Sequence, residues 1–133
     1  MDIEAFALHH KHFTVVANFV NDEGSHHIDS EIFIYSSNLK RFVSFQRLRT
    51  DAAVDWEFFS IGEGLATEYF LAVANQFRID ETGARQYYVD SVIYKWNWNL
   101  FVPFQCFRTN GARKWTAVNG NYFVFISRGT EKL

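Results

Sequence analysis

This chain is poor in three residue types: it has one cysteine, one proline and one methionine in 133 residues. A single cysteine excludes an intrachain disulfide framework and leaves the redox compartment open. No apolar run approaches the roughly 18 residues that a membrane-spanning helix needs. The first thirteen residues lack the basic start and apolar stretch of a signal peptide. We therefore expect no membrane insertion and no dependence on disulfides.

An excess of charge of one sign is also missing. The formal net charge is −2 and the isoelectric point is near 6.2. This balance offers no overall electrostatic attraction for nucleic acid or for an anionic membrane. No Asn-X-Ser/Thr sequon is present either. We expect no nucleic-acid partner.

Aromatic residues, in contrast, are abundant. The chain has 15 Phe, 6 Tyr and 4 Trp, and hydrophobic residues make up 48% of it. Aromatic and β-branched residues favour strands. No stretch keeps the i, i+3, i+4, i+7 apolar spacing of a helix for long. Length and composition together predict one all-β domain with a packed core.

The sequence also repeats itself, and a repeat indicates architecture. HFTVVAN and YFLAVAN both end in Val-Ala-Asn. The repeated segments are Val16-Ala17-Asn18 with Val73-Ala74-Asn75, Ile34-Tyr35 with Ile93-Tyr94, FVSFQ at 42–46 with FVPFQ at 101–105, and Arg49-Thr50 with Arg108-Thr109. The intervals between copies differ slightly, as expected where the loops between strands differ in length.

Each copy predicts four short strands bounded by polar turns. Unit one covers residues 2–49, unit two 54–108, and a half unit of two strands 113–128. Asn119-Gly120 in the half unit is a hairpin signal, because both residues tolerate positive φ. Pro103 falls in a fourth strand, and proline is confined to sheet edges. The prediction is an all-β fold of about ten antiparallel strands in two and a half four-stranded units, with the fourth strand at each edge.

The repeated residues also resemble a known family. They are Tyr69, Phe70, Ala74, Asn75, Ser91, Ile93, Tyr94, Trp96 and Asn97, then Phe101, Phe104, Gln105, Thr109, Gly111, Ala112 and Trp115. This string resembles the epilepsy-associated repeat, also called the EAR or EPTP repeat, of leucine-rich glioma-inactivated proteins and of thrombospondin-type laminin-G-domain and EAR-repeat proteins. The resemblance implies propeller-blade-like units, no catalysis, no cofactor, and an extracellular or secreted recognition role; a cytoplasmic location is the alternative.

The chain departs from that family in its number of repeats. Two and a half units cannot close a propeller, which needs about four to eight blades. Unit one is also degraded, since Ile3 stands at the position of Trp56 and Ser37 at that of Trp96. The half unit would leave sheet edges open, and natural proteins avoid open edges. We therefore expect another subunit to complete the edges, which makes the protein a homo-oligomer.

The residues that recur are expected to be scaffold. Trp56, Trp115, Tyr35, Tyr94 and the Phe-x-x-Phe pairs should fill the core. Gln46 and Gln105 should pair between units. Cys106 should be a small buried hydrophobe rather than a nucleophile.

Functional residues are instead expected where the units differ, in loops on a rigid scaffold. The loops at 19–29 and 76–88 mix carboxylates with donors and aromatic rings, the mixture that a sugar site needs. Trp98 lies at a turn where unit one has Leu39, and it is a candidate stacking platform. The alternatives are that the loops are merely solvated and that Trp98 folds back onto the sheet. The candidate ligand-binding residues are Asp22, His26, His27, Arg78, Asp80, Glu81, Arg85, Trp98 and Asn99.

A metal site and a catalytic site are not expected. His9, His10 and His12 are close in sequence, but neighbouring strand residues point to opposite faces, and no tetrahedral ligand pattern is present. No nucleophile, base and orienting group can be recognised together. We predict no metal, no cofactor and no catalytic residue.

Three functional hypotheses follow. The leading one is a non-enzymatic, multivalent lectin that binds an oligosaccharide or a glycoprotein, with valency supplied by oligomerisation. The alternative is a protein–protein adhesion or receptor-ligand module. A third is a small enzyme or carrier with an aromatic-lined pocket, which would need an N-terminal helix where residues 2–8 indicate a strand.

Overall fold

The computed structural model describes residues 2–18, 29–118 and 122–125. Within them the chain forms twelve β-strands and one short 3-10 turn, η1 (Gly64–Ala66). The strands are β1 (Ile3–Leu8), β2 (Lys11–Val16), β3 (Asp29–Ser36), β4 (Arg41–Arg49), β5 (Ala53–Ile61), β6 (Glu68–Asn75), β7 (Arg78–Ile79), β8 (Arg85–Gln86), β9 (Tyr88–Trp96), β10 (Phe101–Asn110), β11 (Trp115–Val118) and β12 (Tyr122–Phe125). None of the described segments is a helix long and apolar enough to cross a membrane.

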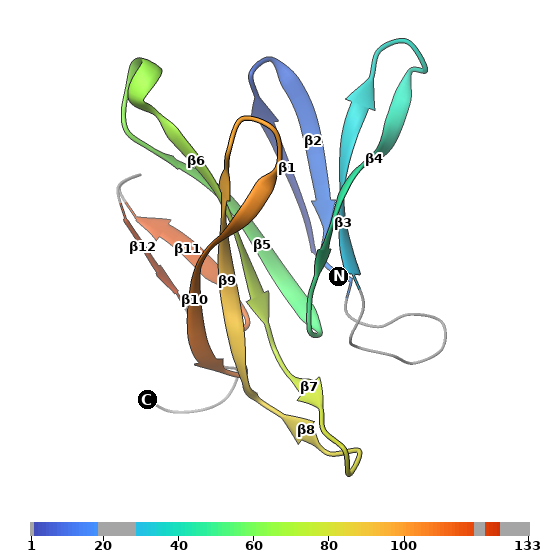
Figure 1. The fold of residues 1–133 in the computed structure, drawn as a ribbon, viewed down its shortest axis with the longest axis vertical. Helices are drawn as coiled ribbons and strands as arrows, with labels where there is room; N and C mark the ends of the chain where they lie inside the picture. Colours follow the sequence, from blue (N-terminus) through green and yellow to red (C-terminus); the bar gives the residue numbers. More distant parts are fainter. Residues whose placement is uncertain (1, 19–28, 119–121, 126–133) are drawn as a thin grey trace.

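Two four-stranded antiparallel sheets dominate the fold (Figure 1). The first sheet has the order β1-β2-β3-β4 and the second the order β5-β6-β9-β10. A C-terminal hairpin, β11–β12, follows the second sheet. The predicted all-β fold of two and a half units is therefore confirmed, and β4 and β10 are edge strands as expected. Pro103 lies on β10, where the register shifts between Pro103 and Gln105.

The segment between β6 and β9 differs from the prediction. The sequence indicated an irregular loop at 76–88, but β7 and β8 pair there as a small antiparallel hairpin, which we name the side hairpin. Its tight turn is closed by Gly83, whose N–H donates to the carbonyl of Asp80 at 3.0 Å. Two-residue strands are too short to give a period-2 pattern, so the sequence signal was missing.

The sheets and the C-terminal hairpin pack face to face in chain order. One core lies between the first and second sheets and includes Phe6, Phe13, Trp56 and Phe101. A second core lies between the second sheet and the C-terminal hairpin and includes Phe59, Phe70, Ala112 and Trp115. The second sheet therefore has packing on both faces, over its β5–β6 half in the case of the C-terminal hairpin. The described residues cover only one face of the first sheet.

The repeated Val-Ala-Asn phrase has a structural role. The backbone N–H of Asn75 donates to Ser91 Oγ at 3.2 Å, and its side-chain amide donates to the carbonyl of Asp90 at 3.0 Å. Ser91 Oγ in turn meets the hydroxyl of Thr109 at 2.9 Å. These buried polar groups satisfy one another and lock β6, β9 and β10 together at one end.

The first sheet contains the same polar corner. Asn18 bonds to Ser30 Oγ at 3.3 Å and to the carbonyl of Asp29 at 2.9 Å. Ser30 Oγ meets the hydroxyl of Thr50 at 2.9 Å. The corner is thus part of the repeat itself, and this explains why the Val-Ala-Asn segment occurs in both units.

Hydrogen bonds between successive units repeat as well. Asp2 Oδ2 accepts the N–H of Trp56 at 3.1 Å, and Asp55 Oδ2 accepts the N–H of Trp115 at 2.7 Å. Gln46 forms a two-way pair with the backbone of Phe101, at 2.7 and 3.0 Å. Gln46 therefore joins two units, as the sequence predicted. These bonds fix the register of each unit on the next.

Several residues expected in the core are exposed. Tyr94 is 6% exposed but its counterpart Tyr35 is 41%, and Phe101 is 1% exposed but its counterpart Phe42 is 47%. The prediction was wrong for Tyr35 and Phe42 because no described segment covers that face of the first sheet. Phe104 is also exposed, since the C-terminal hairpin covers the β5–β6 half of the second sheet.

Cys106 is a further correction. The sequence placed it among buried apolar residues, but it is exposed. It lies on β10, the edge strand, in a stretch that is exposed from Pro103 to Arg108. An edge strand packed on few neighbours leaves its central side chains in water.

Candidate functional site

Asp80 organises the side hairpin. Its Oδ1 accepts the N–H of Thr82 at 2.8 Å, the Thr82 hydroxyl at 2.6 Å and the N–H of Ala84 at 3.0 Å, while Oδ2 accepts the Gln86 side-chain amide at 2.6 Å. Hydrogen bonds from Thr82 and Gln86 hold the pKa of Asp80 well below its usual range. Its acceptor positions are largely used within the turn, so Asp80 shapes the hairpin rather than offering a free carboxylate.

Phe77 forms the buried centre of the same segment. Its side chain is fully buried. The guanidinium of Arg85 lies 4.2 Å from the centre of the Phe77 ring, and the Tyr87 ring packs 5.7 Å away. Arg85 is therefore committed to a cation–π contact that holds β8.

The outer surface of the side hairpin remains available. Arg78 and Glu81 are exposed there, together with the large side chains of Ile79, Tyr87 and Tyr88. The sequence identified Arg78 and Glu81 but missed the three apolar and aromatic residues. The signal for Tyr87 and Tyr88 was their position at the end of a loop that already stood out, where β9 begins.

Trp98 lies in the turn between β9 and β10. It has a positive φ of 77°, which is unusual for a bulky residue. Asn97 Oδ1 holds the turn by accepting the N–H groups of Asn99 at 3.0 Å and Leu100 at 2.8 Å. The Trp98 side chain is 69% exposed, so it does not fold back onto the sheet. The His9 ring stacks on it at 4.6 Å, across the gap between the two sheets.

The predicted ligand residues do not form one site. Arg78, Asp80, Glu81 and Arg85 lie on the side hairpin, before the start of β9, whereas Trp98 and Asn99 follow the end of β9. The two groups lie at opposite ends of the molecule (Figure 1). The remaining three candidates, Asp22, His26 and His27, lie outside the described residues.

Carboxylates gather where the first and second sheets meet. Burial, opposed by the hydrogen bond from Trp115 and reinforced by the neighbouring Asp2 carboxyl, raises the pKa of Asp55 to about 7. Burial also raises the pKa values of Glu4 and Glu57. Glu4 accepts the N–H of Phe58 at 2.8 Å, so these side chains serve the contact between units. In the described part of the chain, no three His, Cys, Asp or Glu residues are placed to hold a metal ion.

The open face of the first sheet carries a shallow groove. Its volume is about 550 Å³. It is lined by Ala5, Phe6, Ala7, His12, Phe13, Thr14, Tyr35 and Phe42. The lining is mostly apolar and holds one titratable imidazole, so the groove is a surface for packing rather than a site for acid–base chemistry.

Comparison with known proteins agrees with the repeat pattern. Residues 41–97 match the EPTP domain. The chain is 38% identical over 107 residues to the human thrombospondin-type laminin G domain and EAR repeat-containing protein, and 36% identical to the mouse protein of that name. Each alignment covers 77% of this chain and 15% of the relative, so the chain spans a small part of the length of those proteins. The resemblance to the EAR repeat is thereby confirmed.

Proposed function

Because the chain is built from EAR-type repeats, we propose that it is a non-enzymatic recognition module that binds another protein, in an extracellular setting. The observation that carries the proposal is the side hairpin. Asp80 and Phe77 fix it internally, while Ile79, Tyr87 and Tyr88 face outward beside Arg78. Tyr and Arg are enriched in protein interfaces and among their energetic hot spots.

A rigid support favours binding, because little conformational entropy is lost when the partner docks. The side hairpin meets this condition, since its turn and its base are both held by side-chain contacts. Its exposed tyrosines would bury a large area with few rotatable bonds. None of these residues is part of the repeated framework, so they can vary without disturbing the sheets.

The test is a binding screen against an array of purified ectodomains, run in parallel with a glycan array on the same sample. We expect a protein ligand whose binding is weakened on the order of tenfold by Tyr88→Ala and by Arg78→Ala. Tyr35→Ala removes another exposed tyrosine, 41% exposed against 61% for Tyr88, and is the control at a concentration where the protein is monomeric. A protein ligand whose affinity is unchanged by both substitutions, or the absence of any protein ligand, would overturn the proposal.

A lectin is the second candidate, and the exposed ring of Trp98 favours it. Indole faces stack on the C–H side of sugars, and Asn99 beside it offers an amide to hydroxyl groups. A sugar site at Trp98 would be small, because the other predicted ligand residues lie on the side hairpin: Arg78, Asp80, Glu81 and Arg85. Glycan-array binding that Trp98→Ala abolishes and Tyr88→Ala spares would favour this candidate over the first.

We also propose that copies of the chain associate head to tail, with the open face of the first sheet of one copy against the exposed edge strand β10 of the next. The support is one pairing between units: Gln46 pairs with the backbone of Phe101. The equivalent Gln105 is exposed, and Phe42, the counterpart of Phe101, is exposed as well. Each chain thus presents both halves of one pairing. Sedimentation should show a concentration-dependent oligomer that Gln105→Ala weakens, and a monomer throughout the micromolar range would refute it.

A further inference from the structure

Four connections gather at one end of the molecule, which we name the tip end. They are the β1–β2 turn (9–10), the β3–β4 turn (37–40), the β5–β6 loop (62–67) and the β9–β10 turn (97–100). Antiparallel order places all four at the same end, and the side hairpin at the other (Figure 1). The tip end therefore has no part in the side-hairpin surface proposed above for a protein partner.

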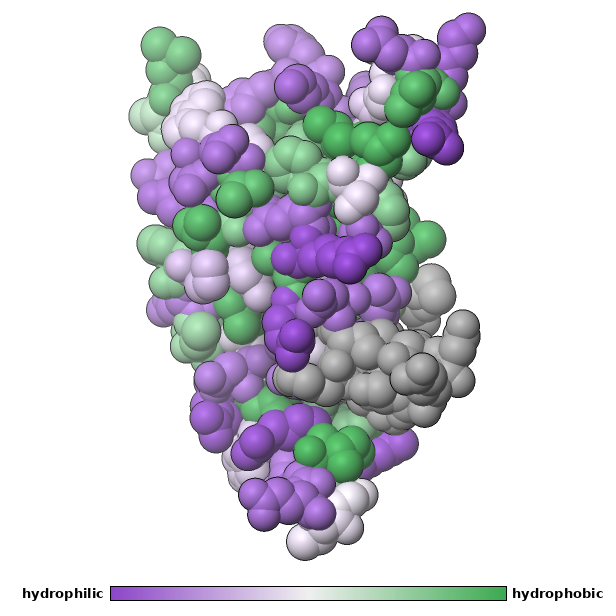
Figure 2. Space-filling model, turned by 45° about the vertical axis from the view of Figure 1, so that its right-hand side comes forward, coloured by the Kyte–Doolittle hydropathy of each residue, from purple (hydrophilic) through white to green (hydrophobic). Residues whose placement is uncertain are grey.

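Three of these connections carry a large apolar side chain at an exposed position. Leu39, Leu65 and Trp98 are each more than half exposed, and Leu100 is partly exposed beside Trp98. Turn positions normally hold polar residues, because they face water. In Figure 2 the apolar residues of this end appear in small areas separated by hydrophilic ones. Leu39, Leu65 and Trp98 belong to three different connections, so each projects from a separate turn.

The backbone holds these side chains outward. The N–H of Leu39 donates to Ser36 Oγ at 3.2 Å, and Lys40 follows it with a positive φ of 54°. Leu65 is the central residue of η1, which the N–H of Thr67 closes on the carbonyl of Gly64. Positive φ at a non-glycine residue such as Trp98 costs conformational energy. The exposure of the three side chains is therefore built into the turns.

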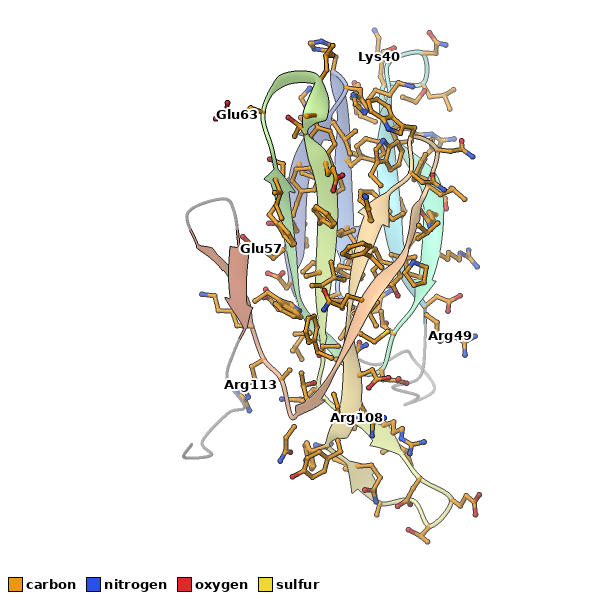
Figure 3. All side chains as sticks on the ribbon, turned by 60° about the vertical axis from the view of Figure 1, so that its left-hand side comes forward. Lys40, Arg49, Glu57, Glu63, Arg108 and Arg113 are labelled. Atoms are coloured by element: carbon orange, nitrogen blue, oxygen red, sulfur yellow. The ribbon has the colours of Figure 1, made fainter. Side chains whose placement is uncertain are left out.

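Basic residues surround these apolar tips. Four basic residues lie in or beside the four connections: Lys11, Lys40, Arg41 and Lys95. The acidic residues there are Glu63 and Glu68. Lys95 pairs with Glu68 at 3.3 Å. Figure 3 shows Lys40 and Glu63 at this end and Arg49, Arg108 and Arg113 toward the other. The tip end thus has a basic excess although the whole chain carries a net charge of −2.

We propose that the tip end docks onto an anionic phospholipid bilayer, with Leu39, Leu65 and Trp98 entering the interfacial region. A fluid bilayer accommodates single apolar side chains wherever they project, whereas a protein partner would need a separate pocket for each. Tryptophan is favoured at membrane–water interfaces. Lysine and arginine near the surface are attracted by anionic headgroups. The expectation from net charge concerned the chain as a whole, and the local distribution of charge leads to a different conclusion for this end.

Vesicle co-sedimentation of the full chain tests the proposal. The probes are vesicles of phosphatidylcholine alone and of phosphatidylcholine with phosphatidylserine. We expect binding to the vesicles that contain phosphatidylserine, weakened on the order of tenfold by Leu65→Ser and by Trp98→Ser. Ile79→Ser removes an exposed apolar side chain from the opposite end and should leave binding unchanged. All three changes lie at exposed positions, so the variants should keep their fold.

Fluorescence gives a second readout that depends on the site. Of the four tryptophans, Trp56 and Trp115 are buried, Trp96 is half-buried and Trp98 is exposed. Vesicles with phosphatidylserine should shift the emission to shorter wavelength, and Trp98→Phe should remove that shift. Equal binding to both vesicle types, binding that survives the tip-end changes, or no binding at all would overturn the proposal. Capture of a protein through Leu39, Leu65 and Trp98 in place of lipid would also count against it.

Discussion

Tyr35 and Tyr94 occupy the same position in two copies of one repeat, yet the first is exposed and the second is buried. The same contrast separates Ile3 from Trp56 and Phe42 from Phe101. Each of the buried residues faces the first sheet, whereas the corresponding face of the first sheet has no described neighbour. The environment of a residue in this protein is therefore set by the unit packed against it as much as by its own unit.

The two sheets share contacts that are formed within each sheet. The Asn-Ser-Thr corner is made with the same partners in both, as are the ion pairs of Arg49 with Asp29 and of Arg108 with Asp90, at 2.9 and 2.8 Å. These contacts depend on strand register within one sheet. The polar contacts of the framework are therefore formed within a single repeat. The burial of its two faces depends on the neighbouring units that pack against it.

The largest expected effect tests the difference in burial between equivalent faces of the two sheets. Trp56→Ala would empty a fully buried position between the sheets and should lower the free energy of unfolding by about 3–5 kcal/mol. Ile3→Ala alters the equivalent exposed position and should change it by less than about 0.5 kcal/mol. Chemical denaturation followed by circular dichroism measures both. Similar losses for the two variants would contradict the difference between the faces.

The next effect tests the shared framework. Ser91→Ala leaves the buried N–H of Asn75 and the hydroxyl of Thr109 without this partner, and should cost about 1–3 kcal/mol. Ser30→Ala removes the same group from the first sheet. We expect equal losses of unfolding free energy for the two variants. A large loss for one and none for the other would show that the corner is not equivalent in the two units.

A smaller effect concerns the bond between units. Gln46→Leu removes two partly buried hydrogen bonds to the backbone of Phe101 and should cost about 1–2 kcal/mol. Gln105→Leu alters the exposed counterpart. Measured by denaturation at a concentration where the protein is monomeric, its effect should stay within about 0.5 kcal/mol. A larger loss from Gln105→Leu would mean that it already has a structural partner within the chain.

The smallest effect is a dependence on pH. The folded pKa of Asp55 is about 7, above its ordinary value of 3.8, so the folded state binds the proton more tightly. The contribution of Asp55 to stability should therefore be full below pH 4, fall as pH rises toward 7, and stay level above that. Because Asp55 is only half-buried, solvent reduces the change to roughly 1 kcal/mol. Asp55→Asn keeps an acceptor for Trp115 and should remove this contribution from the pH profile; a profile identical to that of the unaltered protein would contradict the assignment.

The fold was predictable because its signals are local. Each period-2 pattern and each turn lies within a few residues, the two copies of one phrase marked the repeat, and Pro103 marked an edge strand. The exposure of Tyr35 and Cys106 was not predictable, since it depends on what packs against a face. A repeat pattern shows which residues are equivalent, but it does not show that both have a neighbour.

The candidate site was predictable only in part. The loop at 76–88 forms the side hairpin, and Asp80 and Arg85, two of the predicted ligand residues, are used within it. That Trp98 lies at the other end follows from antiparallel order, because the second-to-third connection and the third-to-fourth turn of a unit lie at opposite ends of the third strand. Ligand residues grouped by composition alone therefore combined two separate surfaces.

Hydroxyl-radical footprinting of the aromatic residues, read by mass spectrometry, tests the central contrast most directly. The two units provide matched pairs of the same residue type, Tyr35 with Tyr94 and Phe42 with Phe101. In dilute solution we expect strong oxidation of Tyr35 and Phe42 and protection of Tyr94 and Phe101, as their exposed fractions require. Equal oxidation within each pair would contradict the account that the second unit is stacked between neighbours while the first presents an open face.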